Sequence, residues 1–263
     1  MIEFFEKNTQ GRDFVMGDIH AHKKRFLRAL ESVDFDTSKD RLFCLGDLID
    51  RGKQPLYILT KLYEEDWFFS IRGNHEQMII DRFENPIAKP PYMTTIKTQD
   101  EASELHRYNG GKWFDKLRND LAREHIYQLV SKLPFAMEIE CDAGLVGLVH
   151  AEVPEDFESW DSFIDELNNS AKVQDEVLWN RLAIESVFNA EAQRFWHEWS
   201  SEFEDEPRFI KGIDAVIHGH TPVREVIQCG NQFWIDTAFK TNDLTILEIN
   251  QLVEMVNSCD ETK

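Results

Sequence analysis

Residues 13–47 read DFVMGDIHAHKKRFLRALESVDFDTSKDRLFCLGD, in which two short apolar runs flank a longer stretch with a helical pattern. The runs at 13–18 and 41–47 are rich in β-branched or aromatic residues and end in Gly-Asp, which is typical of buried strands that open into functional loops. The stretch KKRFLRALESV at 23–33 is the predicted helix. Strand, loop, helix and strand in this order predict an α/β unit with parallel pairing.

The same pattern recurs farther along the chain. Three more apolar runs end in polar groups, namely WFFSIRGN at 67–74, AGLVGLVHA at 143–151 and DAVIHGH at 214–220, and a second helical pattern, PLYILTKLYEE, occupies 55–65. Functional sites of open α/β sheets gather at the carboxyl ends of the strands. We therefore expect all five motifs on one edge of the fold.

The C-terminal part of the chain changes character. AVIHGHTPVREVIQ (215–228), QFWIDTAFK (232–240) and DLTILEINQ (243–251) read as successive strands joined by short turns such as CGN at 229–231. Strands this close in sequence predict antiparallel hairpins. The predicted fold class is therefore α/β, a sandwich of two mixed β-sheets flanked by helices, and we expect residues 1–263 to form a single domain.

Two stretches interrupt this pattern. Residues 85–106 carry prolines and polar residues, which predict a loop over the site. Residues 155–208 hold 15 acidic and 4 basic residues together with four tryptophans, which predicts an acidic helical insertion. Its acidic side is either a solvated helical face with tryptophans packed beneath it or a surface for docking a partner.

Composition narrows the class of protein. The formal charge of −20 disfavours a polyanionic partner, so we expect no nucleic acid. There is no long apolar run, and the start MIEFFEKNTQGRDF lacks the features of a secretory signal, so we expect a cytoplasmic protein without a membrane span. The four cysteines form no C-x-x-C pair, which disfavours a zinc knuckle or redox site. The oligomeric state stays open.

The first two motifs offer ligands for divalent cations. Asp18 and His20 lie two residues apart, so in an extended segment both side chains point the same way and can hold one ion. Asp47 follows the next strand, and its carboxylate can bridge two cations about 3.5–4 Å apart, the spacing of two-metal hydrolysis. The alternative use of Asp47 is that of a helix N-cap.

Three later motif residues add neutral ligands. Asn74 offers a carbonyl oxygen, and His150 and His220 offer imidazoles. Oxygen and nitrogen ligands without thiolate suit Mn, Fe or Zn better than Ca or Cu(I).

Other residues in these motifs suit phosphate chemistry. The guanidinium groups of Arg51 and Arg72 match phosphate oxygens, with a surface salt bridge as the alternative for each. Adjacent residues in a turn point apart, so His75 can face a substrate while Asn74 faces metal. Asp50 could then hold His75 as an imidazolium and make it a proton donor for the leaving alkoxide of a phosphoester.

Taken together, GDIH, GDLIDRG, RGNHE, VHA and GHT resemble the signature of the calcineurin-like metallophosphoesterases. RGNHEQMIID, NGGKWF, VLWNR, HGHTPV and NQFWIDTA are similar to the subgroup of PPP-type serine/threonine phosphatases that includes the lambda phage protein phosphatase. The resemblance covers roughly residues 11–250.

The resemblance implies a role for each motif residue. One metal would be held by Asp18, His20, Asp47 and His220, and the second by Asp47, Asn74 and His150. The phosphate would be bound by Arg51, Arg72 and Arg181. His75 would be the general acid, supported by Asp50, and a metal-bridging water or hydroxide would attack phosphorus in line. The implied cofactors are two divalent ions, Mn²⁺ first, with Fe or Zn as alternatives.

The chain departs from the family pattern at two histidines. The family usually has Gly at the position of Ala21, and His22 follows as an extra imidazole near the site. We expect His22 at the surface or behind the ligands. His218 precedes the expected ligand His220 and would replace it only if the loop is shifted.

The leading functional hypothesis is a metal-dependent phosphatase of phosphoserine and phosphothreonine in proteins or peptides. A symmetrical dinucleoside tetraphosphatase is the alternative, because its motifs are nearly the same. An inactive protein-binding scaffold is a second alternative, which the intact set of ligands and arginines disfavours.

Overall fold

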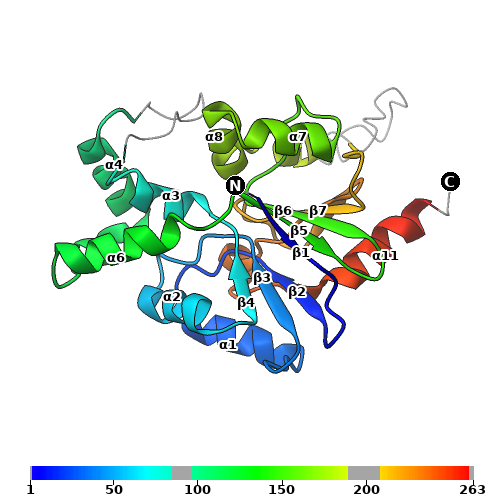
Figure 1. Cartoon of the computed structure of the whole chain (residues 1–263), viewed down its shortest axis with the longest axis horizontal. Helices are drawn as coiled ribbons and strands as arrows, with labels where there is room; N and C mark the ends of the chain where they lie inside the picture. Colours follow the sequence, from blue (N-terminus) through cyan, green and yellow to red (C-terminus); the bar gives the residue numbers. More distant parts are fainter. Residues whose placement is uncertain (1, 85–95, 189–207, 261–263) are drawn as a thin grey trace.

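The computed structural model describes residues 2–84, 96–188 and 208–260 (Figure 1). A four-stranded sheet has the order β10-β2-β3-β4, and a six-stranded sheet has the order β1-β5-β6-β7-β9-β8. The strands are β1 Ile2–Phe5, β2 Asp13–Met16, β3 Arg41–Cys44, β4 Phe68–Ser70, β5 Ala136–Glu140, β6 Leu145–Val149, β7 Ala215–His218, β8 Ile227–Cys229, β9 Gln232–Trp234 and β10 Ile246–Glu248. Both sheets contain parallel and antiparallel pairs, so the predicted sandwich of two mixed sheets is confirmed.

Helices connect these strands and cover the outer faces of both sheets. Their bounds are α1 Lys23–Ser32, α2 Pro55–Glu64, α3 Asn74–Ile80, α4 Gln99–His106, a π-helical turn η1 Arg107–Gly111, α5 Lys112–Asp115, α6 Asp120–Val130, α7 Trp160–Leu167, α8 Ala171–Trp179, α10 Ala238–Thr241 and α11 Ile249–Asp260. In Figure 1, α1 and α2 lie on the outer side of the four-stranded sheet, and α7 and α8 lie beyond the six-stranded sheet. The order of layers is therefore helix, sheet, sheet, helix.

Alternating side chains of the central strands explain this layering. In β2, Phe14 and Met16 pack with Phe26 of α1, whereas Val15 points the other way and packs with Leu148 and Ile217 of the second sheet. Successive residues of a strand face opposite sides of the sheet, so an entirely apolar strand is buried on both faces. The run DFVM therefore belongs in the centre of a sandwich.

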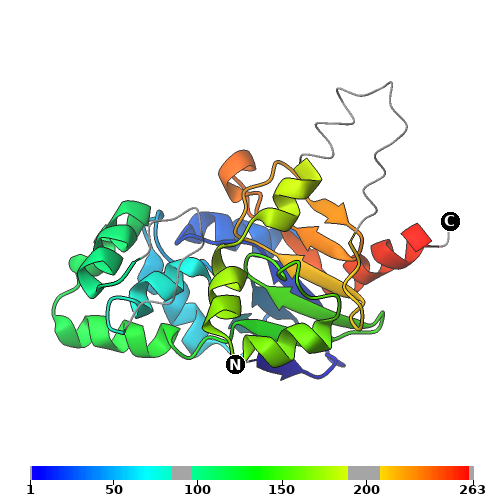
Figure 2. The same ribbon diagram turned by 90° about the horizontal axis from the view of Figure 1, so that it is seen from above.

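The helix α11 and the group α4–α6 lie at opposite ends of the molecule, as both views show (Figure 2). Buried apolar residues of α11, among them Leu252 and Val253, join the core between the two sheets. The segment that carries α4 and α5 packs beside α3 instead, next to the loops that follow β3 and β4.

The strand register brings the motif loops together. Met16, Cys44 and Ser70 are aligned across the parallel strands β2, β3 and β4. Val149 and His218 are aligned in the same way across β6 and β7. The loops that follow these residues therefore start side by side within each sheet, which confirms the predicted parallel pairing.

Two details of the predicted architecture were wrong. The stretch 85–106 was expected to be a loop, but 99–106 is the helix α4, capped by Thr98 and Glu101, while 85–95 lies outside the described residues. Of the C-terminal hairpins, only β8–β9 forms. The strand β9 pairs in parallel with β7, and β10 pairs with β2 in the other sheet.

The acidic stretch 155–208 contains α7, α8 and a helical segment at 182–188, and its remainder at 189–207 is not among the described residues. Trp160 of α7 and Trp179 of α8 are buried. The single domain and the insertion stay predictions. Across the described ranges, no helix is long and apolar enough to cross a membrane.

Candidate metal centre and active site

The predicted ligands lie in the loops at the carboxyl ends of the strands. Asp18 and His20 follow β2, Asp47 follows β3, Asn74 starts α3 after β4, His150 follows β6 and His220 follows β7. All six are buried, with exposed fractions of 6% or less. Buried carboxylates and imidazoles need partners of opposite charge or a metal ion. The six residues expected from separate motifs are thus neighbours in one buried site.

Backbone conformation in these loops is unusual. Of the eight described non-glycine residues with positive φ, six are His20, Ala21, Asp47, Asp50, Arg51 and His220. The left-handed region is costly for residues with a Cβ, and such residues cluster at functional sites. Asp18 and His20 were expected to converge because the segment is extended. They do lie close, with 3.9 Å between Oδ2 and Nε2, but the chain turns at His20, where φ is 46°.

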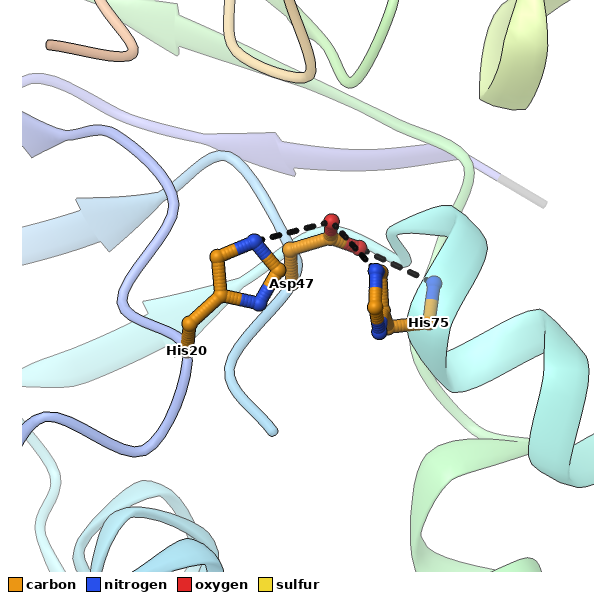
Figure 3. A group of neighbouring side chains, drawn as sticks. All are labelled: His20, Asp47 and His75. Atoms are coloured by element: carbon orange, nitrogen blue, oxygen red, sulfur yellow. Dashed lines mark hydrogen bonds and ion pairs between the residues drawn. The ribbon is translucent and has the colours of Figure 1, made fainter. Parts of the chain in front are cut away.

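Asp47 is shared by two groups of metal-binding atoms. One group comprises His20, Asp47 and His75, and the other comprises Asp18, Asp47 and His150. Figure 3 shows the Asp47 carboxylate between the rings of His20 and His75. Its oxygens lie 3.6 Å from Nε2 of His20 and 3.5 Å from Nε2 of His150. A carboxylate between two sets of ligands has the placement that a bridging ligand requires.

The hydrogen bonds of the His20 and His150 imidazoles leave a nitrogen lone pair of each ring directed into the site. Nδ1 of His20 lies 3.0 Å from the carbonyl oxygen of Ile49, and Nδ1 of His150 bonds the carbonyl oxygen of Leu45. A carbonyl only accepts, so in the neutral rings Nδ1 carries the proton and Nε2 offers a lone pair. This is the usual arrangement of a metal-ligating histidine, and the residues present therefore fit a cation.

Asn74 and His220 lie together with His150. Oδ1 of Asn74 is 2.9 Å from Nε2 of His150 and 3.2 Å from Nδ1 of His220. With the amide turned round, its nitrogen would instead donate to these rings and to Asp47, whereas a bound cation requires the oxygen to face inward. The ring of His220 thus groups with the second predicted set of ligands, and only its backbone N–H reaches the first, donating 3.1 Å to Asp18.

The charges of the site also suit a cation. Burial raises the pKa of Asp18 well above its usual value, and the nearby carboxylates of Asp236 and Asp47 raise it further. Burial lowers the pKa of His20 to about 3, so this ring is neutral near pH 7. The raised pKa of Asp18 shows that its ionised form has too little positive charge nearby, and a divalent ion would supply more.

His75 and Asp50 form a fully buried pair. Nδ1 of His75 donates to Oδ2 of Asp50 over 2.6 Å, which leaves Nε2 facing the site 3.7 Å from Asp47. Burial alone would lower the pKa of His75, but the charges of Asp47 and Asp50 outweigh it and raise that pKa. A proton held on an imidazole near neutral pH suits a general acid.

Two of the three predicted phosphate-binding arginines reach the site. The guanidinium of Arg51 donates to Nε2 of His20 over 2.6 Å, and its second Nη lies 3.1 Å from Nε2 of His75. Nε of Arg181 donates to Nε2 of His220 over 3.2 Å.

Arg72 is the predicted site residue whose contacts lie elsewhere. Its guanidinium donates to Gln77 and to the carbonyl oxygen of Ser131, and it stacks over Phe135 at 4.5 Å. Because Nη1 and Nη2 are paired there, these contacts argue for a structural role of Arg72.

Comparison with known families identifies this arrangement. Residues 14–224, well over half of the chain, match the model of the calcineurin-like phosphoesterases. The chain belongs to the calcineurin-like phosphoesterase family. The family expected from the motifs is thereby confirmed, and the histidine and aspartate groups around Asp47 are the metal-binding groups of a metallophosphoesterase.

Individual relatives of this phosphoesterase differ in how much of it they match. Serine/threonine-protein phosphatase 1 of Salmonella typhimurium is 30% identical over 85% of both chains. The symmetrical bis(5'-nucleosyl)-tetraphosphatase of Cellvibrio japonicus is 39% identical, but over 24% of each chain. The structure of a serine/threonine phosphatase from Saccharomyces cerevisiae matches 89% of this chain and 70% of its own with a TM-score of 0.51 and 16% identity, which shows a shared fold.

Several residues of the phosphoesterase site were not predicted. Glu76 is fully buried and accepts hydrogen bonds from the backbone N–H groups of Asp47, Leu48 and Gly73, which holds the loops after β3 and β4 together. Its place in RGNHE was a signal that could have been used. His106 and Trp113 contact Asp50, and only the Trp lay in a quoted motif, NGGKWF.

The two extra histidines take no part in the ligand groups. His22 is half-buried at the start of α1, as expected for a residue behind or outside the site. His218 is fully buried, and its ring lies over Trp234 with 5.0 Å between centroids. Burial lowers the pKa of His218 to about 3.

Proposed function

We propose that this phosphoesterase is a metal-dependent serine/threonine protein phosphatase that hydrolyses phosphomonoesters of phosphoproteins. The relative named serine/threonine-protein phosphatase 1 supports this substrate class, because the similarity extends over 85% of both chains. The observation that carries the chemistry is the buried Asp47 carboxylate between two groups of metal-binding atoms.

Six residues would hold two divalent ions, with Asp47 shared by both. The first would be held by Asp18, His20 and Asp47, and the second by Asp47, Asn74, His150 and His220. His220 is placed with the second ion here, which differs from the grouping implied by the family resemblance, because its Nδ1 lies beside Asn74. The ions would supply Lewis-acid activation of the phosphate and of the attacking water. We propose Mn²⁺, with Fe or Zn as alternatives, since the donors are oxygen and nitrogen.

Arg51 and Arg181 would bind the phosphate from opposite sides of the site. Arg51 reaches His20 and His75, and Arg181 reaches His220, so their guanidinium groups border both groups of ligands. A guanidinium bonds two phosphate oxygens at once and stays charged at all working pH values. We leave Arg72 out of this clamp, because its donors bond Gln77 and Ser131.

His75 would donate the proton that the leaving serine or threonine oxygen needs. Its Nε2 faces the site, and its Nδ1 is held by Asp50. Protonation of an alkoxide by a positioned acid typically contributes about 10²–10⁴-fold to the rate. A phosphoserine ester has a basic leaving group and depends strongly on this step.

The test is hydrolysis by purified protein. We expect p-nitrophenyl phosphate to be hydrolysed with Mn²⁺ and the activity to disappear with a chelator and return with added metal. A panel of phosphoserine, phosphothreonine and phosphotyrosine peptides beside diadenosine tetraphosphate then assigns the substrate class. Absence of turnover with every divalent ion tried would refute the proposal.

The alternative substrate is a dinucleoside tetraphosphate. It is favoured by the local similarity to the Cellvibrio japonicus tetraphosphatase, which covers 24% of the chain. A match of that extent includes residues for the phosphate chemistry that both classes share, but it leaves out most of the molecule. Higher kcat/KM for diadenosine tetraphosphate than for phosphopeptides would establish this alternative.

A further inference from the structure

Asp50 accepts hydrogen bonds from other residues besides His75, the proton donor that it orients. Its Oδ2 accepts from His75, and its Oδ1 accepts from Nε1 of Trp113 over 2.6 Å and from Nε2 of His106 over 3.1 Å. Asp50 and His106 are fully buried, and Trp113 is half-buried. Three donors on one buried carboxylate leave it little freedom to rotate, because each alternative orientation would leave a buried donor unpaired.

The two additional donors come from a separate segment of the chain. His106 is the last residue of α4 and Trp113 lies in α5, on either side of the π-helical turn η1. Asp50 precedes them by more than fifty positions, in the loop after β3. The chain kinks within η1, because Gly110 has non-helical backbone angles, with φ of 108°.

Two glycines of this turn permit the close approach. A Cβ at Gly111 would lie 2.2 Å from the ring of His106, and a Cβ at Gly110 would lie 2.7 Å from the backbone nitrogen of Arg51. Gly110 also has φ of 108°, a conformation that residues with a side chain rarely adopt. The turn is therefore shaped to the loop that carries Asp50 and Arg51.

A further contact sets which nitrogen of His106 carries the proton. Nη1 of Arg82 lies 3.1 Å from Nδ1 of His106. A guanidinium can only donate, so Nδ1 accepts, and Nε2 carries the hydrogen that it donates in the bond to Asp50. Arg82 is itself paired with Asp115 of α5. His106 is thus held as a hydrogen-bond donor to Asp50.

We propose that His106 and Trp113 are positioning residues that fix the Asp50 carboxylate, and through it the His75 imidazole, for proton donation to the leaving group. This inference rests on the proposed phosphatase function. Among the described residues, neither His106 nor Trp113 belongs to the groups of metal-binding atoms, and both donate to Asp50, so we infer that they act through Asp50. A loosened Asp50 would leave His75 misaligned, and a misaligned acid slows reactions in proportion to their need for a proton.

The test uses two phosphate esters with leaving groups of different basicity. Phenyl phosphate releases the more basic oxygen and needs the acid, whereas p-nitrophenyl phosphate releases a stabilised anion and needs it less. Trp113→Phe removes the indole N–H and leaves a smaller aromatic ring in its place. We expect kcat for phenyl phosphate to fall about tenfold and kcat for p-nitrophenyl phosphate to fall less than about threefold, with KM and bound metal unchanged.

Trp160→Phe is the matched control. Nε1 of Trp160 also donates to a carboxylate over 2.6 Å, that of Glu138, but Trp160 is the first residue of α7 and belongs to a different core cluster. Loss of this bond lowers stability without touching Asp50, so the ratio of kcat for the two esters should equal that of the wild type.

His106 provides a second pair of variants. His106→Gln keeps a donor near the position of Nε2 and should retain the wild-type ratio, whereas His106→Leu removes the donor and should lower kcat for phenyl phosphate selectively. An equal loss on both esters in Trp113→Phe and His106→Leu, with metal retained, would overturn the positioning role while leaving the phosphatase function intact. No turnover of either ester by the wild type would overturn both.

Discussion

The backbone N–H of His75 donates a 2.9 Å hydrogen bond to Oδ1 of Asp47, so the first turn of α3 is aimed at the carboxylate that both ligand groups share. Glu76 of the same turn accepts from the backbone N–H of Asp47 in return. These reciprocal bonds fix the loop after β3 to the start of α3. The position of the carboxylate therefore depends on two motifs that lie more than twenty residues apart.

Replacing Asp47 should remove metal from the whole site. Asp47→Asn keeps the shape of the side chain but loses the charge and one strong ligand oxygen for both groups. We expect little bound metal after dialysis, and a loss of at least about a thousandfold in kcat, since metal activation contributes several kcal/mol. Elemental analysis and p-nitrophenyl phosphate hydrolysis measure the two effects. The exposed Asp243, paired with Arg28, gives a control in Asp243→Asn, which should keep both metal and activity.

His75 can be separated from the ligands by its own variant. His75→Asn should retain metal and lose about 10²–10⁴-fold in kcat on a phosphoserine peptide, because only the proton donor is removed. Asp50→Asn should lose less, because the imidazole remains. Elemental analysis of the bound ions decides between the two roles that the geometry allows. Metal lost from His75→Asn would make His75 a ligand and not the acid.

The two arginines Arg51 and Arg72 should respond differently to the same substitution. Arg51→Met should lower kcat/KM by roughly ten- to a hundredfold. This factor corresponds to the loss of one hydrogen bond from a charged group, which contributes about 1.5–3 kcal/mol. Arg72→Met should leave KM unchanged but reduce the free energy of unfolding by about 1–3 kcal/mol, since Gln77 and Ser131 lose a buried donor. Steady-state kinetics and urea unfolding of both variants form the comparison. A raised KM in Arg72→Met, with stability unchanged, would restore the predicted phosphate contact.

Gly46 and Gly212 form a matched pair for backbone strain. Both have positive φ, 89° and 81°, but a Cβ at Gly46 would lie 2.5 Å from the nitrogen of Gly73, whereas a Cβ at Gly212 meets nothing within 4 Å. Gly212→Ala should lower the free energy of unfolding only by the strain of a left-handed alanine, about 1–2 kcal/mol. Gly46→Ala adds a backbone clash beside Asp47 and should cost clearly more and weaken metal binding. Thermal unfolding and metal titration test this, and equal losses in the two variants would contradict it.

Local patterns carried much of the prediction. The short apolar runs DFVM and RLFCL indicated buried strands, and the Gly-Asp after each placed Asp18 and Asp47 at strand ends. Such inferences depend on residues only a few positions apart, and parallel βαβ connections restrict the topology further. Where local signals were weaker the prediction was wrong, as for α4, whose capping residues Thr98 and Glu101 lay in a stretch interpreted as a loop.

The amino-acid sequence by itself determined the strands, the family and the kinds of side chain at the site, because each of these is written in short motifs. The tertiary structure alone decided which distant groups meet. It set the ring of His220 beside Asn74, turned Arg72 toward Gln77 and Ser131, and brought His106 and Trp113 onto Asp50. These contacts join segments far apart in the chain. Which side chains meet depends on strand register and helix packing, and no local sequence pattern encodes either.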